Sequence, residues 1–317
     1  MQAASSQKIA ARVDLLPEAQ LESAQALVRV AFATQLQLPN PADFGNGSSC
    51  TARWYMDPEG VFGASVGAEL VGVVFAINWG TFGFFGPLVI DPEYWGRGIA
   101  HQLLERVMSY FHDRKVTHSG LFTFSNSPKH ILLYQKYGFE PRFLTALAST
   151  PTRIPEQRPQ YQCYSESGES GRKRHLETLR AITDSLYPGL ELTVEIDNIY
   201  KQQIGETIIY FSADGEAQAF AICHYGNRSE AQRDAMYVKF AAAKGSDGFA
   251  AILDSCQHLA GTRNLLKIDL GINTSRKLAY KLILEKGFRP QTFGIAMEIS
   301  GNAGFNRSDV FAADDWR

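Results

Sequence analysis

The chain has 317 residues, of which 45% are hydrophobic and 20% charged, and its formal net charge at pH 7 is −2. This mixture is typical of soluble globular proteins, and the length suits two domains of ordinary size. The near-neutral charge argues against nucleic acid or an anionic membrane surface as a partner, and no apolar run reaches membrane-spanning length.

Neither the first residues nor the cysteines indicate export. The opening twenty residues lack the apolar core of a signal peptide. The four cysteines are scattered and form no CxxC pair, so a cytoplasmic protein with reduced thiols is the simplest interpretation. The histidines show no ligand spacing with Cys, Asp or Glu, and we therefore predict no metal site.

In the first half, hydrophobic periodicity predicts the order strand, helix, three strands, helix, strand, helix, strand. Pro17 suits the first turn of the first helix, and Gly67 to Glu69 form a hairpin turn signal. The predicted elements are residues 9–16, 17–35, 61–80 (a hairpin), 81–90, 91–111 (a loop and a helix), 120–125, 128–139 and 143–149.

The second half repeats this order after a proline-rich linker, residues 151–159. Its predicted elements are residues 171–187, 206–226 (a hairpin), 235–244, 246–260, 265–272, 275–288 and 293–300. Residues 98–100 recur as 248–250 and residues 138–141 as 287–290, at nearly the same offset. A period this long indicates paired domains, which we place at 1–150 and 160–300, followed by a tail at 301–317.

The loop Trp95-Gly96-Arg97-Gly98-Ile99-Ala100 lies directly ahead of an amphipathic helix. Its glycines let the backbone approach a partner closely, and a helix start with unpaired N–H groups favours an anion. The dinucleotide fingerprint would need a third glycine where His101 stands, and the Gly-Lys-Ser/Thr ending of a P-loop is absent. An ordinary tight strand-to-helix turn is the structural alternative.

The remaining pattern resembles the GNAT superfamily of acyl-CoA N-acyltransferases, whose loop reads Gln/Arg-x-x-Gly-x-Gly/Ala at a helix start. Gly98 and Ala100 match it, whereas Trp95 replaces the usual Gln or Arg. The stretch "LLYQKYGFEP" resembles the family's second signature, with Tyr134 four residues before Gly138. The resemblance implies an α/β (α+β) fold of two tandem GNAT-like domains, each a mixed, mostly antiparallel sheet flanked by helices.

The resemblance also implies roles for particular residues of the first domain. Tyr134 takes the place of the acid that protonates the leaving thiolate, and Ser127 stands where the family often has an Asn near the pantetheine arm. Alternatively, Tyr134 is core packing and Ser127 a helix cap. The expected cofactor-binding residues, which offer main-chain groups at a strand splay or around the diphosphate, are Leu88, Val89, Ile90, Trp95, Gly96, Arg97, Gly98, Ile99 and Ala100.

No general base emerges from the sequence. The strand before the loop, residues 81–90, contains no carboxylate. Asp57, Glu59 and His118 are conceivable, although each is more simply an ordinary solvated residue. The aromatic stretch 78–86 either lines an apolar acceptor pocket or forms strand core.

The second domain lacks both signatures. Asp247 stands where the first domain has Arg97, and Ile283 stands where it has Tyr134. A carboxylate beside a diphosphate is unfavourable, so we predict a degenerate copy that no longer catalyses. Trp316 in the tail is a candidate to pin the chain across the domains.

These observations predict an N-acetyltransferase that moves an acetyl group from acetyl-CoA to a primary amine, by direct attack in a ternary complex. A small-molecule acceptor is favoured over a protein, no membrane or nucleic acid is involved, and a homodimer is left open. The alternative from another class is a non-catalytic acyl-CoA-binding sensor or regulatory protein, since a fold does not fix a function. A third is an unrelated α/β module that binds another phosphorylated ligand.

Overall fold

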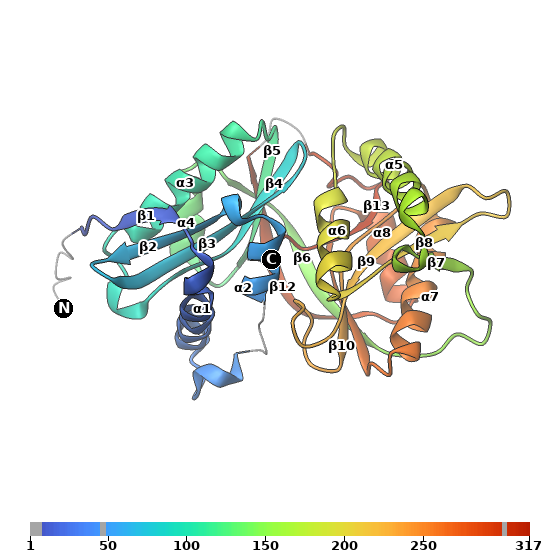
Figure 1. The fold of residues 1–317 in the computed structure, drawn as a ribbon, viewed down its shortest axis with the longest axis horizontal. Coiled ribbons are helices and arrows are strands. Elements are labelled where there is room, and N and C mark those ends of the chain that lie inside the picture. Colours follow the sequence, from blue (N-terminus) through green and yellow to red (C-terminus); the bar gives the residue numbers. More distant parts are fainter. Residues whose placement is uncertain (1–7, 45–48, 300–302) are drawn as a thin grey trace.

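The computed structural model describes residues 8–44, 49–299 and 303–317 (Figure 1). Residues 1–7 of the expected first domain and 301–302 of the expected tail lie outside this part. In the part that it describes, the strands join into one sheet, and helices cover both of its faces. No helix in this part is both long and apolar enough to cross a bilayer.

The elements follow the predicted order, with short additions. The helices are α1 (Leu21–Leu36), α2 (Ser49–Met56), α3 (Ile99–Asp113), α4 (Pro128–Gln135), α5 (Glu169–Leu186), α6 (Thr193–Gln202), α7 (Ser246–Thr262) and α8 (Lys277–Glu285). The strands are β1 (Arg12–Leu15), β2 (Val61–Val66), β3 (Glu69–Trp79), β4 (Phe82–Ile90), β5 (His118–Phe124), β6 (Glu140–Pro151), β7 (Tyr161–Cys163), β8 (Gly205–Phe211), β9 (Ala217–His224), β10 (Ala235–Ala243), β11 (Lys267–Asn273), β12 (Arg289–Ile299) and β13 (Phe311–Ala313). Short 3-10 helices lie at Glu18–Gln20, Pro41–Asp43, Pro58–Gly60, Pro92–Tyr94 and Tyr164–Glu166.

The two halves, which we call first (residues 8–151) and second (residues 152–317), exchange strands. The order in the sheet is β1-β2-β3-β4-β5-β12-β6-β11-β10-β9-β8-β7, and β13 pairs with β10. Strand β12 of the second half therefore lies between β5 and β6, and β6 of the first half lies between β12 and β11. Only β4–β5 and β10–β11 pair in parallel within the described residues. The prediction of mixed, mostly antiparallel sheets flanked by helices is confirmed, and the exchange makes them one sheet.

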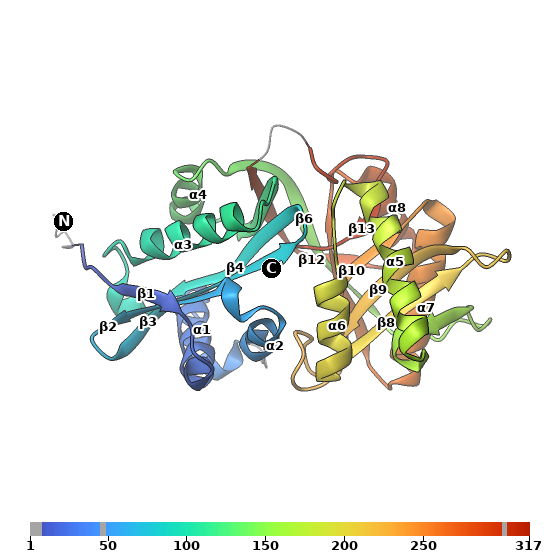
Figure 2. The same ribbon diagram turned by 45° about the horizontal axis from the view of Figure 1, so that its top comes forward.

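Each half places helices on both faces because its strands are apolar on both. In the first half, α3 and α4 lie on one face and α1 and α2 on the other (Figure 2). Strand β3 is accordingly buried from Val71 to Ile77 without alternation. In the second half, α7 and α8 cover the face that carries Ile208 and Val238, whereas α5 and α6 cover the opposite face.

A core at the junction of the halves unites aromatic residues from distant parts of the chain. Trp79 of β3 packs against Phe240 of β10, with ring centroids 5.4 Å apart, and its indole N–H donates to Glu195 of α6 at 3.2 Å. Trp316 is 4% exposed and packs against Phe82 and Phe305. Trp316 thus joins the halves as expected, and the aromatic stretch 78–86 is largely strand core.

Four elements escaped the sequence reading: α2, α6, β7 and β13. The helices are short, with eight and ten residues, so their sequences, SCTARWYM and TVEIDNIYKQ, cover too few turns to show a helical period clearly. The strands have three residues each, too few to show a period.

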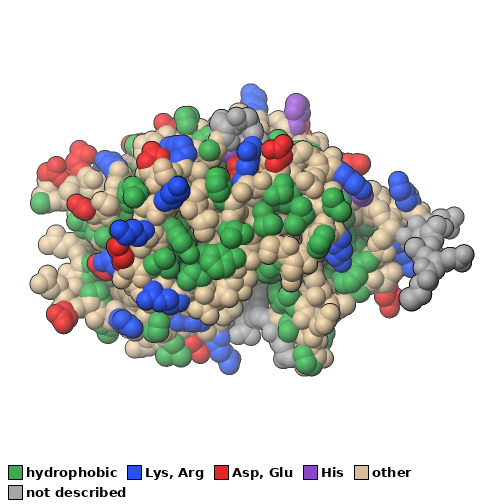
Figure 3. All heavy atoms as spheres, turned by 180° about the vertical axis from the view of Figure 1, so that it is seen from behind, with side chains coloured by type: hydrophobic (Ala, Val, Ile, Leu, Met, Phe, Trp, Pro, Cys, Tyr) green, Lys and Arg blue, Asp and Glu red, His purple; other side chains and the backbone are tan. Residues whose placement is uncertain are grey.

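The face seen from behind carries hydrophobic side chains toward its middle, among charged ones (Figure 3).

Candidate functional site

Strands β4 and β5 separate part-way along their length. They pair in parallel from Phe82 with His118 to Phe84 with Gly120, and no farther. Beyond this point Phe85 pairs with Ala76 and Leu88 with Val74, so that β4 gains one residue as a bulge at Gly86 and Pro87. Residues 88–90 then pair with β3 on one side only, which leaves their other edge available to a strand-like ligand.

The glycine loop turns directly from the end of β4 into α3. Gly96 and Gly98 have φ of 77° and 84°, a region that residues with a Cβ rarely adopt. Gly98 is the N-cap of α3 and has no side chain that could cap the first N–H groups, whereas its carbonyl oxygen accepts a hydrogen bond from Gln102 at 3.5 Å. The indole N–H of Trp95 donates to the carbonyl oxygen of Ile90 at 2.8 Å and ties the loop to β4. The N-terminal N–H groups of α3 are therefore presented as an anion site requires.

A cavity of about 530 Å³ runs along the splay and the loop. It is enclosed by first-half residues from α1, β4, the loop, α3 and α4. The sequence-predicted residues that line it are Leu88, Val89, Ile90, Trp95, Gly96, Gly98, Ile99 and Ala100. The structure thus places residues 88–90 and 95–100 along one cavity. The resemblance assigns the first segment to the pantetheine arm of the carrier and the second to its diphosphate.

The cavity also has cationic walls that the sequence reading missed. Lys8, Lys129 and Lys136 line it, and Lys129 lies 4.4 Å from the centroid of the Trp95 ring. Three lysines along one cavity favour a ligand with several negative charges. Lys129 and Lys136 are seven residues apart at the ends of α4, two helical turns, and this spacing was the signal available in the sequence.

Three of the predicted residues do not line the cavity. The guanidinium of Arg97 lies 5.1 Å from the ring centroid of Tyr94. Ser127 is buried and its hydroxyl contacts Nδ1 of His130 at 2.8 Å. Burial, and then Lys129, lowers the pKa of His130, which itself lines the cavity.

Tyr134 lies behind the cavity, at the point where β4 leaves β5. It is 8% exposed, and its ring contacts Phe85 with centroids 5.6 Å apart. Burial raises the pKa of its hydroxyl well above the ordinary value. A tyrosine with an ordinary pKa is already protonated at neutral pH, so Tyr134 carries a proton that it can donate, and burial makes it a weaker acid.

The conceivable bases lie elsewhere. Asp57 accepts a hydrogen bond from the hydroxyl of Tyr110, and Glu59 pairs with Arg114. His118 is buried, with Nε2 3.1 Å from a carboxylate oxygen of Glu298. None of the three lines the cavity among the described residues.

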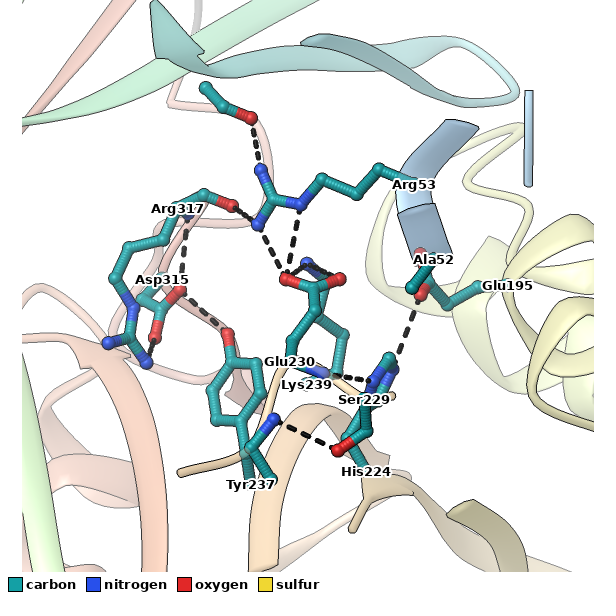
Figure 4. Close-up of polar contacts among 12 residues, drawn as sticks. Ala52, Arg53, Glu195, His224, Ser229, Glu230, Tyr237, Lys239, Asp315 and Arg317 are labelled. Atoms are coloured by element: carbon teal, nitrogen blue, oxygen red, sulfur yellow. Dashed lines mark hydrogen bonds and ion pairs between the residues drawn. The ribbon is translucent and has the colours of Figure 1, made fainter. Parts of the chain in front are cut away.

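A buried polar cluster joins the halves beside the β4 bulge (Figure 4). Arg53 of α2 donates to the carbonyl oxygen of Gly86, and to Glu230 and the main-chain oxygen of Arg317 at 2.5 Å each. Lys239 donates to both carboxylate oxygens of Glu230, at 2.8 and 2.9 Å. The cluster therefore fixes the bulge from the side of the second half.

Three members of this region have the spacing of metal ligands. Donor atoms of Glu195, His224 and Glu230 lie within 4.8 Å of one another. However, Arg53 and Lys239 already bind Glu230, so a metal cation would meet two fixed positive charges. We assign no metal to these residues.

The equivalent places in the second half are altered. Helix α7 begins at Ser246, so that Gly248 lies inside the helix instead of in a turn before it. Strands β10 and β11 pair from Ala235 to Val238 and then separate, and β13 pairs with β10 at Ala241 to Ala243. Strand β13 of the same chain thus occupies the place along β10 that corresponds to the open edge of β4 in the first half. Arg276 holds this segment by donating to the carbonyl oxygen of Ala312 at 3.1 Å and to Asp314 at 2.7 Å.

Known proteins share both the sequence pattern and the architecture. Residues 31–139 match the model of the acetyltransferase (GNAT) family. A putative acetyltransferase from Pyrococcus horikoshii is 14% identical, with a TM-score of 0.69 over 96% of this chain and 95% of that one. A GCN5-related N-acetyltransferase from Sphaerobacter thermophilus is 10% identical, with a TM-score of 0.60 over 94% and 98%. No curated protein sequence matches the chain.

Residues 31–139 thus resemble the acetyltransferase (GNAT) family in sequence, and the chain shares the fold of these solved structures. The similar solved structures span both halves, so the paired architecture is itself shared.

Proposed function

We propose that the protein is an N-acetyltransferase that moves an acetyl group from acetyl-CoA to a primary amine of a small molecule. One observation supports this proposal most strongly. A single cavity is lined by the open edge of β4, by the first residues of α3 and by lysines. A thioester carrier has a strand-like arm and a diphosphate, and the cavity offers a partner to each. We further propose that residues 1–150 form the transferase domain and that residues 160–300 form a second domain without an acyl-CoA site. Residues 151–159 link the two domains, and residues 301–317 form a tail. We propose that the protein is located in the cytoplasm.

In the proposed ternary complex, the amine nitrogen attacks the thioester carbonyl carbon and the carbon–sulfur bond then breaks. A main-chain N–H within residues 88–90 polarises the carbonyl oxygen as negative charge develops on it. Tyr134 protonates the departing thiolate, and the proton of the substituted ammonium passes to water, from which the Tyr134 phenolate regains a proton. A tyrosine hydroxyl carries its proton at neutral pH, so it can act as the acid in that step.

The test is thiol release by the purified chain with acetyl-CoA and a panel of small primary amines. Release above that seen with heat-denatured protein, together with formation of the N-acetylated amine by mass spectrometry, supports the proposal. Absence of product from every amine, while acetyl-CoA still binds, overturns the transferase function.

One observation favours a non-catalytic acyl-CoA-binding sensor as the second candidate. Among the described residues, the wall of the cavity carries no carboxylate to accept the ammonium proton. Binding without thiol release is the result that would select this candidate.

A further inference from the structure

A second groove of about 620 Å³ lies between the halves, on the side of the buried cluster. Its floor is formed by β6 and β12, the strands that the two halves exchange, and by β11. Glu230 and Gln232, between β9 and β10, and Arg317 border it. Its volume falls in the range of small-molecule sites.

Two residues that border this groove, Arg317 and Glu230, connect it to the bulge of β4. Arg317 borders the groove, and its carbonyl carbon would lie 3.5 Å from a Cβ placed on Gly86. Glu230 also borders the groove and binds Arg53, which donates to the carbonyl oxygen of Gly86. The carrier cavity begins two residues later, at Leu88, and is lined by first-half residues. The partly exposed bulge therefore lies where the groove and the carrier cavity approach each other.

The groove has a surplus of positive charge. Lys267 pairs with Asp269 at 2.9 Å, and Arg317 pairs with Asp315 at 2.8 Å. The Glu230 carboxylate, as described above, has two cationic partners in Arg53 and Lys239. Among the residues that line the groove, three cations, Lys267, Arg289 and Arg317, thus stand against two carboxylates, Glu230 and Asp269.

Arg289 is the cation that is available to a ligand. Its guanidinium donates to the carbonyl oxygens of Leu284 and Phe288, both at 2.9 Å, and no carboxylate of the described residues forms an ion pair with it. The side chain is exposed at the groove, so a ligand can reach it without unfolding. Arginine at such a place favours a carboxylate or phosphate over a neutral group.

We propose that this groove is the acceptor site, and that the acceptor is a small primary amine that also carries an anionic group, a carboxylate or a phosphate. The anionic group binds toward Arg289, and the amine points to the bulge at Gly86, beyond which the thioester lies. This inference rests on the proposed transferase function for its chemistry, but the binding of the anion does not depend on turnover.

The first measurement is equilibrium binding, by calorimetry, of matched pairs to the full chain: L-methionine against L-methioninamide, and O-phosphoethanolamine against ethanolamine. We expect the anionic member of at least one pair to bind about tenfold more tightly. The pair that shows the difference distinguishes a carboxylate from a phosphate. Arg289→Gln should abolish the difference, whereas Lys281→Gln, an exposed cation of α8 outside the groove, should preserve it.

The second measurement is thiol release from acetyl-CoA with the same pairs. We expect Arg289→Gln to raise KM for the anionic amine about tenfold and to leave both kcat and the dissociation constant of acetyl-CoA unchanged. Tighter binding of the anionic member without any thiol release would support anion binding in the groove and contradict the transferase function. Equal binding and equal turnover within both pairs, or an equal loss for both members in Arg289→Gln, would overturn the acceptor site.

Discussion

Arg53 and Glu230 form an ion pair 2.5 Å long between α2 of the first half and the segment between β9 and β10 of the second, and both side chains are almost fully buried. Replacement of Glu230 by Gln leaves Arg53 and Lys239 buried without a carboxylate. We expect Glu230→Gln to lower the free energy of unfolding by about 3–5 kcal/mol in denaturant titrations.

The matched control is Glu216→Gln, which removes the exposed pair with Lys244. That pair is screened by water, so the change should cost less than about 1 kcal/mol. A loss in Glu230→Gln no larger than in this control would contradict a structural role for the buried pair.

Glu230 also predicts a dependence of stability on pH. Burial alone would raise the pKa of Glu230, but Arg53 and Lys239 outweigh it and hold the pKa well below its usual range. The carboxylate therefore contributes stability that is full above the unfolded pKa of about 4.3 and is lost as the pH falls from there toward the folded value. Between pH 6 and pH 3 the midpoint of thermal unfolding should fall more steeply in the wild type than in Glu230→Gln. Parallel curves would exclude this contribution.

Tyr134→Phe removes the hydroxyl and keeps the ring against Phe85. If the phenol protonates the leaving thiolate, kcat should fall by about 10²-fold or more while the dissociation constant of acetyl-CoA stays nearly constant. Tyr137→Phe is the control, because that hydroxyl donates to the main-chain oxygen of His101 at 2.9 Å and lies in the same segment. An unchanged kcat in Tyr134→Phe would remove the residue from the mechanism and leave it as core packing.

Lys129 and Lys136 predict the salt dependence of carrier binding. Their exchange for Gln, singly and together, should weaken acetyl-CoA binding and flatten its decline with ionic strength, because each contributes a screened attraction to phosphate. Binding is measured by calorimetry at low and high salt. Lys173→Gln, on the exposed side of α5, is the control and should leave both quantities unchanged. Loss of affinity with an unaltered salt slope would argue against phosphate contacts.

The sequence predicted most of the elements because their apolar residues recur at helical or strand spacing. It also predicted the glycine loop, since Gly96 and Gly98 stand between a strand and an amphipathic helix. The exchange of β6 and β12 was beyond such reasoning, because both strands have the same pattern of apolar residues whichever half they join.

Side-chain roles were harder to predict than main-chain roles. Eight predicted residues line the cavity through a strand edge and a helix start, places that the loop pattern defines. Arg97 and Ser127 instead found partners close by, in Tyr94 and His130. Arg53 and Glu230 are 177 residues apart in the chain, and no local pattern indicates that they meet.

We propose that the carrier binds to one site per chain, at the loop of the first half. The most direct measurement is calorimetric titration of acetyl-CoA into the wild type, Ala100→Glu and Ala250→Glu, since these alanines occupy matching positions of the sequence repeat, in the first turn of α3 and one turn into α7. We predict one site per chain, abolished when a carboxylate at residue 100 repels the diphosphate and retained with the same change at residue 250. Absence of binding to the wild type at millimolar acetyl-CoA, or loss of the site in Ala250→Glu alone, would contradict the account.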